Sequence, residues 1–145
     1  MTNPQWFMLV GGLLLGACGS SLSSGQAVTN WAHNSGFRSN LPTLVSDARI
    51  LKKIVNDPRS SESDLRTFGT VMFEDVSAAN ASLPTPDTQL TSLLSEAYTN
   101  LGSAAQTSYN AAGSARLRAE VMRYLDTGAR NLQLATLRLA SAEQG

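Results

Sequence analysis

The sequence predicts an all-α protein: an up-down helical bundle of three long helices plus a shorter first helix, after an N-terminal signal peptide. Three observations support this fold class. Almost no segment after residue 40 alternates apolar and polar residues with the period of two that β-strands require. Apolar residues recur instead every three or four positions, the spacing of one helix face. Proline, glycine and capping residues separate these periodic segments and mark helix ends.

An irregular segment, residues 26–41, precedes the first helix. Its first part can form a short helix that ends near Gly36, because glycine readily adopts the left-handed conformation of a helix stop. The first helix is predicted to begin at Pro42, since a proline in the first turn lacks only an N–H that would be unpaired anyway. Asn56-Asp57-Pro58 ends it. Its apolar face is Leu44, Val45, Ala48, Leu51 and Val55.

The second helix follows Ser60-Ser61. Ser61 and Asp64 have the spacing of a capping box, with Asp in place of the usual Glu. Pro84 is predicted to end this helix, because proline disfavours helical geometry in the residue before it. The apolar row is Leu65, Phe68, Met72, Val76, Ala79 and Leu83.

The third helix begins in Leu83-Pro84-Thr85-Pro86-Asp87. Thr85 is the expected N-cap, Pro86 the first helical residue, and Asp87 an acidic group at the positive end of the helix dipole. The helix continues to Ala112 with apolar residues at steps of three and four, namely Leu90, Leu93, Leu94, Ala97, Leu101, Ala104, Ala105 and Ala112.

Gly113-Ser114 is predicted to stop the third helix and to cap the fourth. The alternative is one unbroken helix through this point, because a single glycine costs only about 1 kcal/mol. Short connections make neighbouring helices antiparallel. The apolar residues of the fourth helix repeat about every 3.5 positions, as in a bundle seam; they are Leu117, Val121, Leu125, Gly128, Leu132, Ala135 and Leu139.

The N-terminal sequence indicates export. Leu15-Gly16-Ala17-Cys18 resembles the lipobox of bacterial lipoproteins, and the apolar stretch before it is too short to cross roughly 30 Å of hydrocarbon. The resemblance implies that Cys18 carries a diacylglycerol, typically with palmitate, and becomes the new N-terminus. Residues 1–17 are then a lipoprotein signal peptide, 18–25 a flexible tether, and 26–145 the helical-bundle domain. The predicted location is the extracytoplasmic face of the cell membrane.

One feature departs from this pattern. Residues 2–5 contain no Lys or Arg, whereas such segments are usually basic. The alternatives are a signal peptide cut elsewhere, a short uncleaved anchor, or an ordinary buried helix.

Residues 83–109 also resemble a family of small, uncharacterised actinobacterial lipoproteins or secreted helical proteins. The resemblance lies in a Leu-Pro-x-Pro-Asp turn followed by a helix with Leu-Leu, Ala-Tyr and Ala-Ala pairs. Ser108 stands where some members carry a cysteine. The resemblance implies a fold and a compartment but no activity.

The composition excludes several classes of function. The formal net charge is zero, which is unlike the strongly basic face of a nucleic-acid-binding protein. Cys18 is the only cysteine, so a lipidated chain has no thiol left for a disulfide, a metal site or a nucleophile. No catalytic or metal-binding set and no cofactor are expected.

His33 is the only histidine. It is either a general base or metal ligand, or a half-exposed side chain beside Trp31, which we favour because no acidic residue lies within twelve positions. Glu74 and Asp75 are adjacent, so they point about 100° apart around a helix and do not converge. We expect both to be solvated.

A stripe of arginines follows the fourth helix. It is interpreted either as a contact for phospholipid head groups or, preferably, as a solvated face with acidic partners, Glu120 for Arg123 and Asp126 for Arg130. The stripe contains Arg116, Arg123 and Arg130, with Arg118 and Arg138 nearby.

These patterns favour a non-enzymatic binding or accessory module of the cell envelope, held to the membrane through Cys18 and contacting an envelope protein. The alternative is a carrier or sensor of an apolar ligand, such as a lipid, held between helices near Met72, Phe73 and Met122. An enzyme is the third hypothesis, and no convergent acid, base and positioning groups support it.

Overall fold

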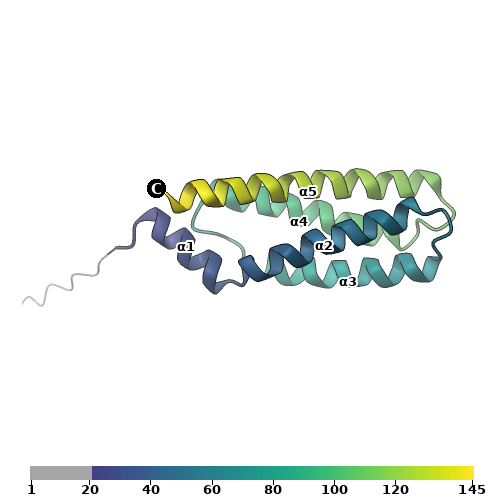
Figure 1. Cartoon of the computed structure of the whole chain (residues 1–145), viewed down its shortest axis with the longest axis horizontal. Helices are drawn as coiled ribbons and strands as arrows, with labels where there is room; N and C mark the ends of the chain where they lie inside the picture. Colours follow the sequence, from purple (N-terminus) through teal and green to yellow (C-terminus); the bar gives the residue numbers. More distant parts are fainter. Residues whose placement is uncertain (1–20) are drawn as a thin grey trace, which may run out of the picture.

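The computed structural model describes residues 21–145, so the predicted signal peptide and Cys18 lie outside the described residues. Within this range the protein is all-α, as predicted, with five helices and no strand. The helices are α1 (Ser24–Asn34), α2 (Phe37–Asn56), α3 (Glu62–Asn80), α4 (Thr88–Ser108) and α5 (Ala115–Glu143) (Figure 1).

The four longer helices lie alongside one another as a bundle, and α1 lies at the end where α5 finishes (Figure 1). α4 packs against α3 and α5, and α2 packs against α3 and α5. The order around the core is therefore α2, α3, α4, α5. α1 packs on α5 and α2, and Trp31 Nε1 donates a hydrogen bond of 2.9 Å to Ser82 O. This bond ties α1 to the connection between α3 and α4.

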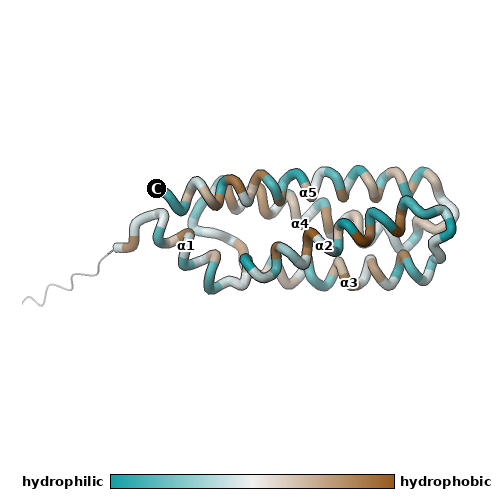
Figure 2. Tube along the Cα trace, in the orientation of Figure 1, coloured by the Kyte–Doolittle hydropathy of each residue, from teal (hydrophilic) through white to brown (hydrophobic). Residues whose placement is uncertain are grey.

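Each helix is amphipathic, and the hydropathy along each one changes with the helical repeat (Figure 2). The closest packing lies between α4 and α5, where small residues allow the two backbones to approach. A Cβ added at Gly128 would lie 2.7 Å from Leu101 Cγ and 3.3 Å from Ala97 O. The small residues buried on these two helices are Ala97, Ala104, Ala105, Gly128 and Ala135, and the carbonyl oxygen of Ala105 lies against Gly69 of α3.

Helical structure begins earlier than the sequence predicts. Ser23 and Gln26 form a capping box at the start of α1, so the predicted tether 18–25 ends inside a helix and residues 26–41 are not irregular. Gly36, with φ of 73°, separates α1 from α2 as predicted. The predicted start at Pro42 is wrong because Phe37 is buried and already belongs to α2. Proline is therefore accommodated inside the helix, where it loses one backbone hydrogen bond.

The ends of α3 and α4 also differ from prediction, whereas the cap of α3 is confirmed. Ser61 Oγ accepts from Asp64 N at 3.1 Å, and Asp64 Oδ2 accepts from Ser61 N at 3.0 Å. α3 stops at Asn80 rather than near Leu83, since a turn with Leu83 N donating to Asn80 O replaces its last helical turn.

The N-cap of α4 is Asp87, not Thr85. Its carboxylate accepts from Leu90 N at 2.6 Å. The Thr85 hydroxyl instead donates to Asp87 O at 2.6 Å and holds the preceding loop, so Pro86 lies outside the helix. α4 ends at Ser108, four residues before the predicted Ala112, because Ala111 N donates to Ser108 O in a turn.

The break between α4 and α5 is confirmed. Gly113 adopts the left-handed conformation with φ of 70°, and Ser114 Oγ accepts from Leu117 N at 3.2 Å. The alternative of one continuous helix is therefore wrong. Most of the predicted apolar faces are buried, but Val45 and Phe68 are 40% and 38% exposed. These two residues lie at the edges of their apolar stripes, where no neighbouring helix covers them.

Candidate functional site

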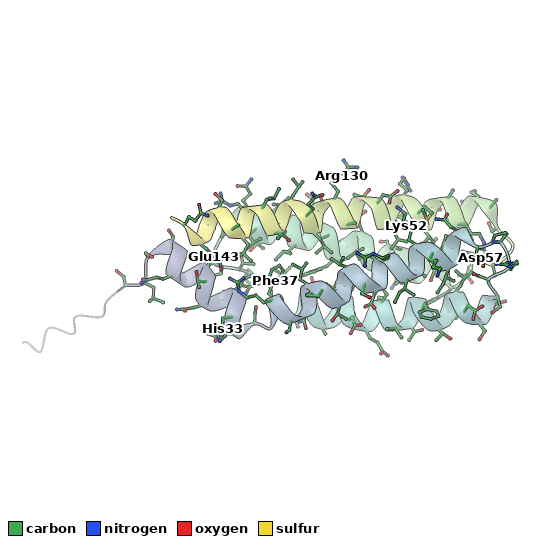
Figure 3. The ribbon with its side chains drawn as sticks, viewed as in Figure 1. His33, Phe37, Lys52, Asp57, Arg130 and Glu143 are labelled. Carbon is green, nitrogen blue, oxygen red and sulfur yellow. The ribbon has the colours of Figure 1, made fainter. Side chains whose placement is uncertain are left out.

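Cys18, the predicted lipidation site, lies outside the described residues. His33 is exposed on the last turn of α1 and lies on the outer side of the bundle (Figure 3). No ion pair with a carboxylate involves His33 in residues 21–145.

Glu74 and Asp75 have different environments, which corrects the prediction that both are solvated. Glu74 is exposed, whereas Asp75 is half-buried and lies close enough to Asp47 of α2 to hydrogen-bond with it. Burial, followed by the hydrogen bond and the charge of Asp75, raises the pKa of Asp47 to about 6. Asp47 Oδ2 is buried and has no hydrogen-bond partner within residues 21–145. Asp47 and Asp75 lie 28 positions apart with no shared motif, so this carboxyl pair across α2 and α3 was missed from the sequence.

The arginine stripe of α5 splits into two groups. Arg118 donates to three carbonyl oxygens at the end of α2, with distances of 2.8 Å to Val55 O, 2.9 Å to Asp57 O and 3.2 Å to Ser60 O. Arg138 forms an ion pair with Asp87 at 2.5 Å, and this contact lowers the pKa of Asp87. These two arginines stabilise helix connections and are not part of an open cationic surface.

The other three arginines face solvent. Arg116 and Arg123 lie 3.8 Å and 3.9 Å from Glu120, which confirms the predicted pairing of Glu120 with Arg123. The predicted pairing of Asp126 with Arg130 is wrong, because Asp126 pairs with Lys52 of α2 at 2.6 Å. Arg130 points away from the bundle (Figure 3) and has no ion pair among residues 21–145.

The residues proposed to line an apolar cavity do not meet around one. Met72 is fully buried in the core, Met122 is half-buried against it, and Phe73 is 36% exposed between α3 and α4. Phe73 lines a hollow of about 260 Å³ between α3 and α4, and a more apolar groove lies in a different part of the bundle.

An apolar groove of about 380 Å³ lies between α2 and α5. This volume is within the range of about 300–1,000 Å³ that small-molecule sites occupy. Most of the lining is hydrocarbon, and the charged side chains are restricted to the end near Lys52. The α2 side is formed by Leu41, Val45, Ala48, Arg49 and Lys52, and the α5 side by Leu125, Asp126, Ala129, Leu132, Gln133 and Thr136.

Polar contacts hold the two walls of the groove together. An ion pair between Arg38 and Glu143 joins the start of α2 to the end of α5. The Lys52–Asp126 pair joins the walls at the other end of the groove, and Arg118 lies beyond it. α2 and α5 are therefore joined at both ends of the groove. The packing of α2 against α5 is less extensive than the packing of α4 against α5.

The charges at the groove do not balance. Lys52 is paired with Asp126, whereas Arg49 lines the groove and forms no ion pair with any acidic side chain in residues 21–145. One positive charge therefore remains uncompensated at this end. Arg49 is exposed, so its guanidinium donors are available to an anion.

Sequence reasoning missed this groove, although one signal was present. Val45 was assigned to the core, yet it follows Leu41 by four residues and lies at the edge of the α2 stripe. Leu41 and Val45 widen the apolar face of α2 beyond what one neighbouring helix can cover. An apolar stripe that is wider than its packing partner indicates a surface groove.

No helix within residues 21–145 has the length and hydrophobicity needed to cross a membrane. The same residues contain no group of three or more His, Cys, Asp or Glu side chains placed to hold a metal ion. Neither a protein-family model, nor a curated protein, nor a solved structure shows significant similarity to this chain.

Proposed function

We propose that this chain is a lipid-anchored protein of the extracytoplasmic membrane face, in which an up-down helical bundle acts as a non-enzymatic binding or accessory module. The lipobox-like sequence ending at Cys18 supports the anchor and the location. The groove between α2 and α5 supports the binding role and is the single observation that carries it.

The groove has the properties of a binding site on a rigid scaffold. Its walls are two long helices fixed at both ends, so its shape does not depend on a loop. Val45 is 40% exposed and lines the groove, so part of its apolar surface is open to a ligand. The bundle therefore presents a preformed apolar surface with a polar rim.

A carrier or sensor of an apolar ligand is the second candidate function, and the same groove favours it. The proposed ligand site is the α2–α5 groove and not the surroundings of Met72, which belongs to the core. The two candidates differ in the partner that they predict: an envelope protein in the first and a lipid in the second.

Intact mass spectrometry of protein extracted from its own membranes tests the anchor. We expect a chain that begins at Cys18 with added acyl mass, and we expect Cys18→Ala to lack that mass. An unmodified chain beginning at Met1 would overturn the proposed anchor.

Site-specific photo-crosslinking tests the groove. A photo-crosslinking amino acid replaces Ala129, which is exposed and lines the groove, or Ala119, an exposed alanine of α5 outside it. Irradiation in the native membrane is expected to give adducts at position 129 and few at position 119. The mass of the adduct separates a protein from a lipid, and equal yields at the two positions would overturn binding in the groove.

A further inference from the structure

The dimensions and charge of the α2–α5 groove identify one class of occupant. We propose, on the basis of the binding function above, that the groove holds the single acyl chain of a fatty acid, with the carboxylate beside Arg49 and Lys52. The chain then extends along the helix axes toward Leu41 and Thr136.

The length of the groove matches one acyl chain. On α2 the lining extends from Leu41 to Lys52, and on α5 from Leu125 to Thr136. At 1.5 Å per helical residue, each wall is about 16 Å long. One leaflet contributes half of a hydrocarbon core of roughly 30 Å, so an acyl chain in a membrane reaches about 15 Å. A single chain therefore fills the groove from end to end.

Charge gives the bound chain a direction. The charged lining residues Arg49, Lys52 and Asp126 all lie toward one end, whereas the lining at Leu41 and Thr136 is uncharged. Lys52 and Asp126 neutralise each other at 2.6 Å, so the guanidinium of Arg49 provides the net positive charge. A guanidinium binds a carboxylate through two parallel N–H donors. The methyl end of the ligand then lies at the uncharged end of the groove, beside Leu41.

The test uses the full chain in lipid nanodiscs and photoreactive analogues of hexadecanoic acid and hexadecanol. Peptide mass spectrometry locates the labelled residues. We expect the acid to label α2 and α5 at the groove several-fold more efficiently than the alcohol, since an ion pair with an exposed side chain contributes up to about 1 kcal/mol. Labelling by the acid is expected to rise with chain length and to level off once the groove is full.

Two matched variants test the role of the cation. Arg49→Gln is expected to remove the preference for the acid, whereas Arg130→Gln is expected to leave it unchanged, because Arg130 points outward from α5 and does not line the groove. Both residues are exposed, so neither change disturbs the core.

The outcomes separate this inference from the proposed function. Equal groove labelling by acid and alcohol, in both the wild type and Arg49→Gln, overturns the fatty-acid assignment while binding in the groove stands. Competition by an amphipathic peptide, with no competition by unlabelled hexadecanoic acid, also overturns it. If neither analogue labels the groove and crosslinkers at positions 129 and 119 trap partners equally, both the inference and the proposed function fail.

Discussion

Replacement of Asp47 by asparagine should stabilise the protein at neutral pH and have little effect in acid. Asp47 of α2 faces Asp75 of α3, and its Oδ2 atom is buried without a hydrogen-bond partner in the described part of the chain. Burial is the largest cause that raises the pKa of Asp47 from its ordinary value of 3.8 to about 6, followed by the contact with Asp75. Asp47→Asn retains the shape of the side chain and removes the charge that the site disfavours.

The sign and magnitude follow from proton linkage. The folded state holds the Asp47 proton more tightly than the unfolded state does. The stability that the wild type gains from protonated Asp47 is therefore complete below pH 3.8 and is lost as the pH rises through about 6. The rise of this pKa from 3.8 to about 6 corresponds to a change in the free energy of unfolding of at most about 3 kcal/mol, at 1.36 kcal/mol per pKa unit. The site retains contact with solvent, which screens the interaction, so we expect about 1–2 kcal/mol at pH 8.

Urea denaturation followed by far-UV circular dichroism at pH 4 and pH 8 measures this difference. The free energy of unfolding of Asp47→Asn should exceed that of the wild type at pH 8, and the two should nearly coincide at pH 4. Glu74→Gln, an exposed carboxylate next to Asp75, is the control and should show no such pH dependence. A difference between Asp47→Asn and the wild type that is the same at both pH values would refute the reasoning.

Three further predictions concern packing and capping, and the free energy of unfolding measures each of them. Gly69→Ala should destabilise the protein by about 1–3 kcal/mol, because its Cβ would lie 2.8 Å from Ala105 O. The matched control, Gly102→Ala, should stabilise it by up to about 1 kcal/mol, because the nearest atom to its Cβ would be 3.8 Å away. Arg118→Met should cost about 1–3 kcal/mol through three lost carbonyl contacts, and Arg116→Met, at an exposed site, should cost almost nothing. Ser61→Ala should lower the free energy of unfolding by about 1 kcal/mol through loss of the α3 cap. An unchanged free energy of unfolding would contradict the capping role of Ser61.

Features set by local sequence were predictable. Ser61 and Asp64 form their capping box with each other, and Gly36 and Gly113 separate helices through their own positive φ angles. These signals need no knowledge of the neighbouring helices. The helix starts depended on more than local signals. α2 begins at Phe37 and not at Pro42, because burial of the Phe37 side chain outweighs the preference of proline for the first turn of a helix.

Features that depend on the neighbouring helix were not predictable from periodicity. Asp47 and Asp75 are 28 residues apart, and only the packing of α2 against α3 brings their carboxyl groups together. Asp126 has the correct spacing for Arg130 on its own helix, yet it pairs with Lys52 of α2. A helical pattern defines which face a side chain occupies, but it does not define which side chain on the next helix lies opposite.

The α2–α5 groove follows from the unequal packing of α5 against its two neighbours. On the α4 side, Gly128 lets the α5 backbone approach Leu101 and Ala97 closely. On the α2 side the facing residues include Arg49 and Lys52, whose long charged side chains favour the solvent-exposed rim and do not pack as a core layer. α2 and α5 share one buried core and are joined by polar contacts at both ends of the seam, and apolar surface between those contacts remains open to a ligand.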